Sequence, residues 1–476
     1  MPDAALQLDH ANVLDAAVGA AHGLGAAEIR RAETAAKQIV AQIEKERRSG
    51  QHRYRDLPAD RVMLRQVQSA VRLRAGRFEN LVVLGIGGSA LGNIALQTAL
   101  NPAYHNVMPG KSRRGPRLFV MDNVDPVQVA NLLQVLAGSL PKTLFNVISK
   151  SGETAETAAQ FLIVRDLLAR KLGKAGLARN ILVTTDPEGG TMRGIVEAEG
   201  YDALPVPPGV GGRFSVLSAV GLFSAGMCGV KIDRLLAGAA AMGRRVGERV
   251  VKKNPAAMLA LLLHAFYVRG KRLHVMMPYA HQLKDLADWY RQLWAESLGK
   301  QHDLDGQLVN LGPTPIKALG ATDQHSQVQL YREGPNDKVF IFLEVEKFAA
   351  DVKIPQAGSL CHKSGTPADM GYLQGKSLAE LLNAEKRATE YALAASHRPS
   401  MTIRFPAVNE HTVGQFIMLW EAATSIMGGL LNINPYDQPA VQTGKEFTFA
   451  LMGKKGYEKQ AREYSRFARR GGKMTT

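Results

Sequence analysis

The sequence predicts an α/β protein in which parallel sheets are flanked by helices. Short apolar, β-branched runs alternate with longer segments that have helical periodicity. This alternation occurs in two stretches, separated by the polar and basic segment 243–255. Strands that are joined by helices of this length form parallel sheets with right-handed crossovers. The chain of 476 residues is also long enough for more than one domain.

The first 60 or so residues are predicted to be helical, because residues 26–48 are rich in Ala, Glu, Lys and Gln and place apolar residues at helical spacing. The stretch that follows predicts one α/β domain. Its expected strands, each paired with the helix after it, are 81–85 with 89–100, 117–122 with 126–136, 144–149 with 153–172, and 180–186 with 190–199.

The alternation resumes after segment 243–255 and predicts a second α/β unit with less regular loops. The expected elements are helix 255–268, strand 272–278, helix 281–298, strand 338–345, helix 377–396, strand 401–405 and helix 412–426. We therefore expect an N-terminal helical arm at 1–60, a first domain at 61–245, and a second domain with C-terminal helices at 246–476.

The composition indicates a globular protein of a reducing compartment. The chain is 46% hydrophobic and 21% charged, and its two cysteines lack the spacing of a disulfide framework or a zinc site. No signal-peptide pattern and no apolar run of 18 residues occur, so we expect a cytoplasmic protein without a membrane partner. The net charge of +16 is scattered among acidic residues, which favours a solvated basic surface over nucleic-acid binding.

The segment LVVLGIGGSALGN, residues 81–93, passes from an expected strand through a glycine-rich turn into a helix. Such a turn presents backbone N–H groups and the positive end of a helix to an anion. Gly85, Gly87 and Ala90 fit a dinucleotide-binding pattern, but the acidic residue expected about 20 positions later is absent. Taken alone, the turn is equally compatible with a ligand loop and with a tight structural connection.

A second strand-to-helix segment, VISKSGETAET at 147–157, is rich in hydroxyl groups. It supplies Ser149, Ser151 and Thr154, and Lys150 adds a positive charge. Hydroxyl groups before a helix also serve as N-caps, but one cap needs only one of them. Because a phosphate monoester presents three oxygens, the several hydroxyls favour a phosphate site shared with the glycine-rich turn.

Two further segments carry candidate catalytic groups. The loop VPPGVGGRFSVLSAVG, 206–221, places Arg213 at a helix start, beside the sheet edge where α/β proteins bind ligands. The alternative role for Arg213 is a structural ion pair. In helix 281–298, Gln292 and Glu296 are spaced i,i+4 on a face beside Trp289, which could place Glu296 in a cleft between domains. Taken alone, the pattern favours the alternative, a solvated glutamate on an amphipathic helix. The opposite face should pack in the core through Leu283, Leu286, Ala287, Tyr290, Trp294 and Leu298.

Three polar residues nearer the C-terminus complete the set of candidates. His325 lies in the polar turn GATDQHSQ and could act as a general acid or base. Gln438 and Lys445 lie in NINPYDQPAVQTGK and are expected ahead of a helical, apolar segment. Each of these residues taken singly is also compatible with an ordinary surface position.

Taken together, the chain from about Leu81 to Gly456 resembles the glucose-6-phosphate isomerase (phosphoglucose isomerase) family, bacterial type. The resemblance rests on six ordered motifs: GIGGSALG, SKSGETAET, GVGGRFS, QLWAESLGK, GATDQHSQ and DQPAVQTGK. It implies two SIS (sugar isomerase), flavodoxin-like domains and reversible conversion of glucose 6-phosphate and fructose 6-phosphate, without metal or cofactor. It also implies a homodimer whose active sites are completed by the partner's histidine. The sequence departs from the family at Ala440 and Gln442, where Gly and Glu are common.

The resemblance also implies a role for each candidate residue. The residues that correspond to the sugar-phosphate binding site are Ser89, Ser149, Lys150, Ser151, Thr154, Gln292 and Gln438. Glu296 corresponds to the base that moves a proton between C1 and C2 through a cis-enediol. Arg213 corresponds to the cation that stabilises the developing negative charge. His325 and Lys445 correspond to the groups that open the ring and handle its hydroxyls.

Three alternatives remain open from the sequence. One is a dual phosphoglucose and phosphomannose isomerase, which pocket residues outside the motifs would decide. Another is a noncatalytic phosphosugar-binding regulator, which would need the phosphate loops but not Glu296, His325 and Lys445 together. A dinucleotide-dependent oxidoreductase is the third, weakened by the missing ribose-binding acid.

Overall fold

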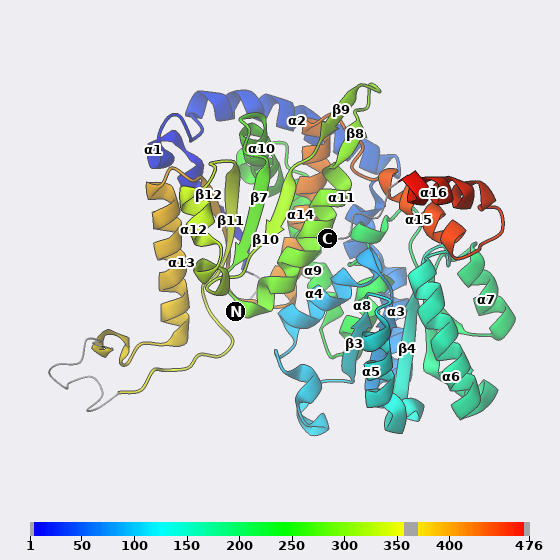
Figure 1. Cartoon of the computed structure of the whole chain (residues 1–476). Coiled ribbons are helices and arrows are strands. Elements are labelled where there is room, and N and C mark those ends of the chain that lie inside the picture. The colour runs from blue at the N-terminus through cyan, green and yellow to red at the C-terminus, as the bar shows by residue number, and fades with distance from the viewer. Residues whose placement is uncertain (1–3, 357–369, 471–476) are drawn as a thin grey trace.

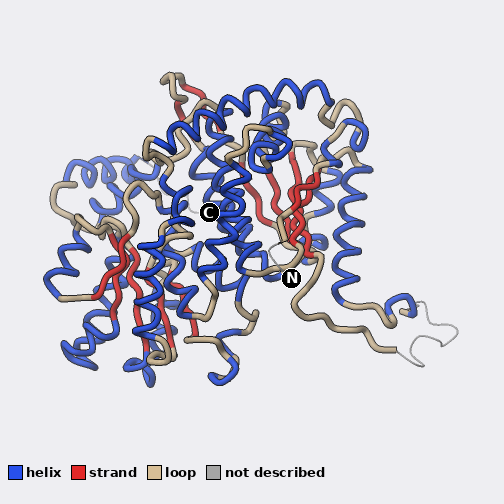
Figure 2. Tube along the Cα trace, turned by 180° about the vertical axis from the view of Figure 1, so that it is seen from behind, coloured by secondary structure: helices blue, strands red, loops and turns tan. Residues whose placement is uncertain are grey.

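The computed structural model describes residues 4–356 and 370–470. Two five-stranded sheets lie side by side, with helices between them and on their outer faces (Figure 1). The same layers are seen from behind in Figure 2. The predicted α/β class with parallel sheets flanked by helices is confirmed.

The first sheet is entirely parallel, with the order β3-β2-β4-β5-β6. Its strands are β2 (Asn80–Leu84), β3 (Arg117–Met121), β4 (Thr143–Ile148), β5 (Ile181–Thr185) and β6 (Asp202–Pro205). The sequence predicted the first four of these. It missed β6, because a four-residue edge strand that is partly exposed has no continuous apolar run.

The helices around this sheet are α3 (Arg61–Arg74), α4 (Leu91–Leu100), α5 (Pro126–Leu136), α6 (Ala155–Asn180), α7 (Thr191–Glu199), α8 (Ala219–Met227) and α9 (Ile232–Val246). Some predicted helix bounds were wrong. Ser89 lies in the short 3-10 turn η3 (Gly87–Ser89) and not in the following helix. Helix α6 continues past the predicted end at residue 172, although Gly173 departs from helical geometry.

The second sheet has the order β1-β12-β11-β7-β10 and is parallel except for β1. Its strands are β1 (Gln7–Asp9), β7 (Leu273–Pro278), β10 (Thr314–Lys317), β11 (Lys338–Val345) and β12 (Ser400–Phe405); β8 (Lys300–His302) and β9 (Leu308–Leu311) form a separate antiparallel pair. The prediction of an entirely helical segment 1–60 was therefore wrong. Strands of three or four residues, such as β1 and β10, are too short to show a period of two.

The remaining helices are α1 (Asp15–Val18), α2 (Ala26–Arg48), α10 (Pro255–Val268), α11 (Lys284–Leu298), α12 (Val328–Glu333), α13 (Leu378–Ala395), α14 (Glu410–Leu430), α15 (Ala440–Leu451) and α16 (Glu458–Arg470). Helices α2 and α10 have the predicted bounds. Lys445 lies inside α15, so its predicted place ahead of the helix was wrong. The described residues contain no helix that combines the length and hydrophobicity of a membrane span.

One continuous apolar core connects the two sheets through the helices between them. Leu81 and Val83 of β2 face this core, as do Ile341 and Leu343 of β11. The alternate residues of each strand face smaller clusters beneath the outer helices. Both faces of the sheets are thus buried, which explains why these strands are nearly uninterrupted apolar runs. The predicted core-facing stripe of helix 281–298 is fully buried in the same core.

Candidate active site

The glycine-rich turn after β2 contacts the arginine loop after β6. A methyl group at Gly88 would lie only 2.3 Å from the carbonyl carbon of Gly212 and 2.7 Å from the amide nitrogen of Arg213. This backbone-to-backbone approach requires the absence of a side chain at Gly88. The next contact is with α11, because a methyl group at Gly87, where φ is +56°, would lie 3.0 Å from Nε2 of Gln292. Three predicted motifs therefore meet at one place.

Arg213 lies in η7 (Gly212–Phe214), is only 4% exposed, and is held by acceptors from two other segments. Its Nε donates to Oγ of Ser297 at 2.7 Å, and its Nη1 donates to Oε1 of Gln438 at 2.8 Å. Its Nη2 donates to the carbonyl oxygens of Pro435 at 2.7 Å and Asp437 at 3.1 Å. The planar guanidinium therefore has one fixed orientation.

The carboxylate of Glu296 lies between two partners. Nε2 of Gln292 donates to its Oε2 at 3.1 Å, as the i,i+4 spacing predicted, and Nη1 of Arg213 lies 3.6 Å from its Oε1. Burial lowers the pKa of Arg213, while the negative charges of Glu296 and Asp437 oppose that shift. The Glu296 side chain remains 25% exposed, so the carboxylate is fixed in place and still accessible to a small molecule.

The hydroxyl-rich loop lies beside the glycine-rich turn, because β2 and β4 are neighbouring strands. Oγ of Ser149 accepts from the amide of Gly152 at 3.0 Å, and Oγ of Ser151 accepts from that of Glu153 at 3.2 Å. Both hydroxyl hydrogens remain available to donate to an anion. Thr154 is the residue before α6, and its side chain makes no capping bond there. Simple helix capping therefore does not account for these hydroxyls.

Two predicted residues are not brought to this cluster. His325 ends the short turn η10 (Thr322–His325), Lys445 lies on α15, and both side chains are exposed. Within residues 4–356 and 370–470, no hydrogen bond or ion pair joins either of them to Glu296. Ser89 and Lys150 lie in their expected loops, Ser89 partly buried and Lys150 exposed. The cluster within the chain therefore consists of Arg213 and its partners, Glu296 with Gln292, and the two loops.

Sequence reasoning missed two members of the cluster. Ser297 binds Arg213 as described above, and Lys300 donates from Nζ to the carbonyl oxygens of Glu296 at 3.2 Å and Ser297 at 2.8 Å. Burial lowers the pKa of Lys300. A basic residue just beyond a helix end is a known signal for such capping, and the motif QLWAESLGK carried it.

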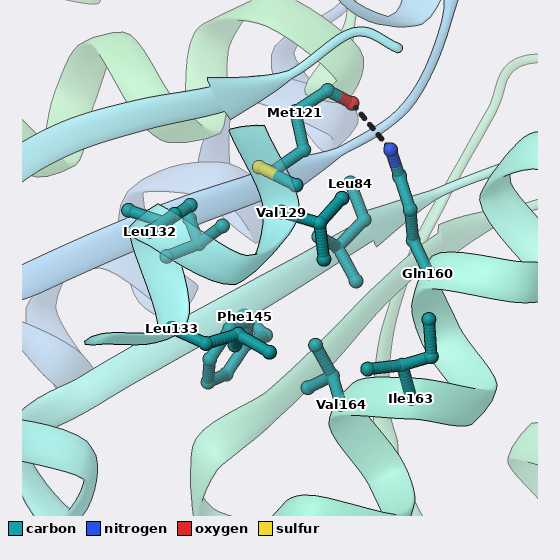
Figure 3. A pocket seen from close by; sticks show the side chains of 10 residues that line it. Leu84, Met121, Val129, Leu132, Leu133, Phe145, Gln160, Ile163 and Val164 are labelled. Carbon is teal, nitrogen blue, oxygen red and sulfur yellow. Dashed lines mark hydrogen bonds between the residues drawn. The ribbon is translucent and has the colours of Figure 1, made fainter. Parts of the chain in front are cut away.

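A separate pocket lies between the first sheet and helices α5 and α6 (Figure 3). Its lining is apolar apart from Gln160, whose Nε2 donates to the carbonyl oxygen of Met121 at 3.2 Å. None of the predicted site residues lines it. The part of the chain that the structure describes also contains no cluster of three or more His, Cys, Asp or Glu side chains suited to a metal ion.

Residues 61–466 match the family model described as phosphoglucose isomerase. The chain belongs to the phosphoglucose isomerase family. The glucose-6-phosphate isomerase of Carboxydothermus hydrogenoformans is 46% identical over 398 residues, which cover 84% of each chain. A crystal structure of a Thermus thermophilus protein described as hypothetical matches with a TM-score of 0.81 and 35% identity, covering 94% of this chain and all of that one.

A second solved structure has a fold similar to that of this chain. A glucose-6-phosphate isomerase from Chlamydia trachomatis matches with a TM-score of 0.71 at 24% identity, covering 85% of this chain and 75% of that one. The two-sheet architecture therefore recurs where sequence similarity is low.

Proposed function

We propose that this chain is an enzyme that interconverts glucose 6-phosphate and fructose 6-phosphate. The observation that carries this proposal is the Glu296 carboxylate, held by Gln292 on one oxygen and 3.6 Å from the buried guanidinium of Arg213 at the other. Membership of the phosphoglucose isomerase family and the names of its relatives support the same reaction. A noncatalytic regulator is not favoured, because it would have no need for this carboxylate and cation.

In this proposal, the two loops that follow β2 and β4 bind the phosphate of the substrate between them. Ser149 and Ser151 donate hydroxyl hydrogens, and the exposed Lys150 contributes positive charge. Ser89 and Thr154 complete the contacts from the two helix starts. The N–H groups at these helix starts add a favourable field for the anion.

The chemistry moves a carbonyl group from C1 to C2. After ring opening, Glu296 removes a proton from one carbon and returns it to the adjacent carbon. Between these two proton transfers the substrate is an enediolate, and negative charge develops on its oxygens. The guanidinium of Arg213 is already fixed in place, so it stabilises this charge without reorganising. Gln292 and Gln438 orient the sugar and the two charged groups. The proton and the carbonyl move within one molecule, so the balanced reaction consumes no second substrate.

Ring opening requires an acid and a base, which we assign to His325 and Lys445. Because both are exposed in the single chain, we propose a homodimer in which His325 acts at the active site of the partner subunit. Exposed apolar side chains on and beside α15 and α16, including Met452 at 81% and Phe467 at 71% exposure, support coverage of this region in an assembly. The cysteine content supports a cytoplasmic location.

The test is a turnover assay with fructose 6-phosphate, without added metal or nucleotide. We expect robust activity for the purified chain and a loss of at least about 100-fold in Glu296→Gln. Glu333→Gln is the matched control, because Gln329 donates to Glu333 at 2.7 Å in the same i,i+4 arrangement on α12. Inactive protein that still binds the phosphosugar would favour the regulator, and near-normal activity of Glu296→Gln would refute the assignment of the base.

A further inference from the structure

Lys300 lies just beyond the end of α11, and its ammonium group joins two segments of the site. Its Nζ donates to the carbonyl oxygens of Glu296 and Ser297 in the last turn of the helix. The same Nζ donates to the carbonyl oxygen of Asp437 at 3.1 Å and lies 3.5 Å from Oδ1 of its carboxylate. The side chain is only 6% exposed. One buried cation therefore connects the end of α11 to the loop after α14.

Lys300 and Arg213 bind the same two residues. Ser297 offers its hydroxyl oxygen to Arg213 and its carbonyl oxygen to Lys300. Asp437 offers one carbonyl oxygen to both cations, each at 3.1 Å. A shift of Ser297 or Asp437 would therefore move the acceptors of Arg213. The ammonium group of Lys300 bonds to backbone oxygens and lies beside the carboxylate of Asp437, and it acts on the Glu296 carboxylate through charge alone, without a hydrogen bond to it.

We propose that Lys300 is a positioning residue for catalysis, which holds the end of α11 and the loop at Asp437 so that Arg213 and Glu296 keep their relative placement. This inference rests on the proposed isomerase function. A displacement of about 1 Å in a reacting geometry can cost on the order of 100-fold in rate, so a clamp outside the reacting groups is sufficient to matter. A buried ammonium is costly unless it is well paired, and here three carbonyl oxygens and a carboxylate offset that cost.

The chain offers a matched control in Lys271. This lysine is 5% exposed and donates from Nζ to the carbonyl oxygen of Asn336 at 2.9 Å and to the side chain of the same residue. Burial lowers the pKa of Lys271 to about 8, as it lowers that of Lys300. Its hydrogen bonds involve none of the site residues. Lys271→Met therefore removes a comparable buried cation without touching the clamp.

The experiment compares wild type, Lys300→Met and Lys271→Met for kcat, KM and thermal midpoint, with fructose 6-phosphate as substrate. We expect kcat of Lys300→Met to fall at least about tenfold with KM within about threefold, because alignment is lost in the reaction and phosphate binding is retained. Lys271→Met should lose comparable thermal stability and keep kcat within about twofold of wild type.

Two outcomes would overturn the inference: unchanged kcat in Lys300→Met, or an equal kcat loss in both variants, which would indicate stability alone. If Lys300→Met does not accumulate as folded protein, Lys300→Gln is measured in its place, since its amide NH2 keeps two N–H donors and should give a smaller loss in kcat. An inactive wild type would instead count against the proposed function, so the two failures are distinguishable.

Discussion

Oε1 of Glu296 lies 3.6 Å from Nη1 of Arg213, although the two side chains come from separate elements, α11 and η7. The arginine side chain is 2% exposed and the glutamate side chain 25% exposed. The cation is thus fixed within the protein, while the carboxylate reaches the surface of the site. This asymmetry suits a rigid electrostatic group beside a proton-transferring group.

Arg213→Lys should lower kcat by about 100- to 1,000-fold, with a smaller effect on KM. An ammonium group cannot reproduce the planar fork that reaches Ser297, Gln438 and the two carbonyl oxygens. Steady-state kinetics check this. The control is Arg398→Lys, since Arg398 also donates to three carbonyl oxygens, at Tyr331, Arg332 and Gly334. A comparable kcat loss in both variants would contradict a role for Arg213 in the reaction.

Gly88→Ala should reduce both stability and activity. The added methyl group would lie 2.3 Å from backbone atoms of Gly212, and overpacking of this kind costs about 1–3 kcal/mol or more. The displaced loops should also lower kcat/KM at least about tenfold, because Arg213 follows Gly212 directly. Gly194→Ala in α7 meets nothing within 4 Å and should be neutral or slightly stabilising. Denaturant unfolding and kinetics of both variants test the contact, and a Gly88→Ala protein with normal values would disprove it.

His274 should make the folded protein sensitive to acid. Its ring is fully buried on β7, where Nδ1 accepts from Nε1 of Trp294 at 3.2 Å, and burial lowers its pKa from 6.5 to about 3. Between these values the unfolded chain binds a proton that the folded chain does not bind. The free energy of unfolding should therefore fall as the pH drops below 6.5, by up to about 1.4 kcal/mol per pH unit from this group.

The check is the pH dependence of unfolding in wild type and His274→Gln between about pH 6.5 and 4.5, within the window where the two states differ in protonation. The variant keeps an acceptor for Trp294 and should show a shallower dependence. His302→Gln at an exposed position on β8 is the control and should retain the wild-type slope. Parallel curves for wild type and His274→Gln would show that this histidine is not the source.

Mixing two inactive variants tests whether the sites are shared between subunits. Glu296→Gln and His325→Ala should each be inactive alone. In a mixed dimer one site combines both substitutions, and the other has neither, if His325 acts in the partner. Equal co-expression should therefore restore about a quarter of wild-type activity, from half the dimers with half the sites intact. No recovery in isolated mixed dimers would place His325 in the site of its own subunit.

Much of the fold could be predicted because its strands are buried on both faces. β2, β4 and β11 are nearly continuous apolar runs, and such runs between helical segments have few other interpretations. The strands that were missed, such as β1 and β6, have three or four residues and lie at sheet edges, where pairing is decided by distant parts of the chain. The division into domains at residues 61–245 and 246–476 stays a prediction.

The candidate site was predictable only where its geometry is local. The contact of Gln292 with Glu296 follows from helical spacing, and the structure contains the corresponding hydrogen bond. The convergence of Arg213 on Ser297 and Asp437 depends on how three segments fold against one another, which no periodicity encodes. The capping role of Lys300 at the end of α11 is local and had a sequence signal, whereas its contact with Asp437 is not local, since the two residues are distant in sequence.

The pairing of β1 with β12 has a consequence for how the protein is made. Asp9 and Arg404 form an ion pair across these strands while lying 395 positions apart in the chain. At about 5–20 residues per second, β1 leaves the ribosome on the order of 20–80 s before its partner strand is synthesised. Residues 7–9 therefore lack their partner strand β12 during most of translation. This edge strand of the second sheet can be added only after β12 has emerged, late in the synthesis of the chain.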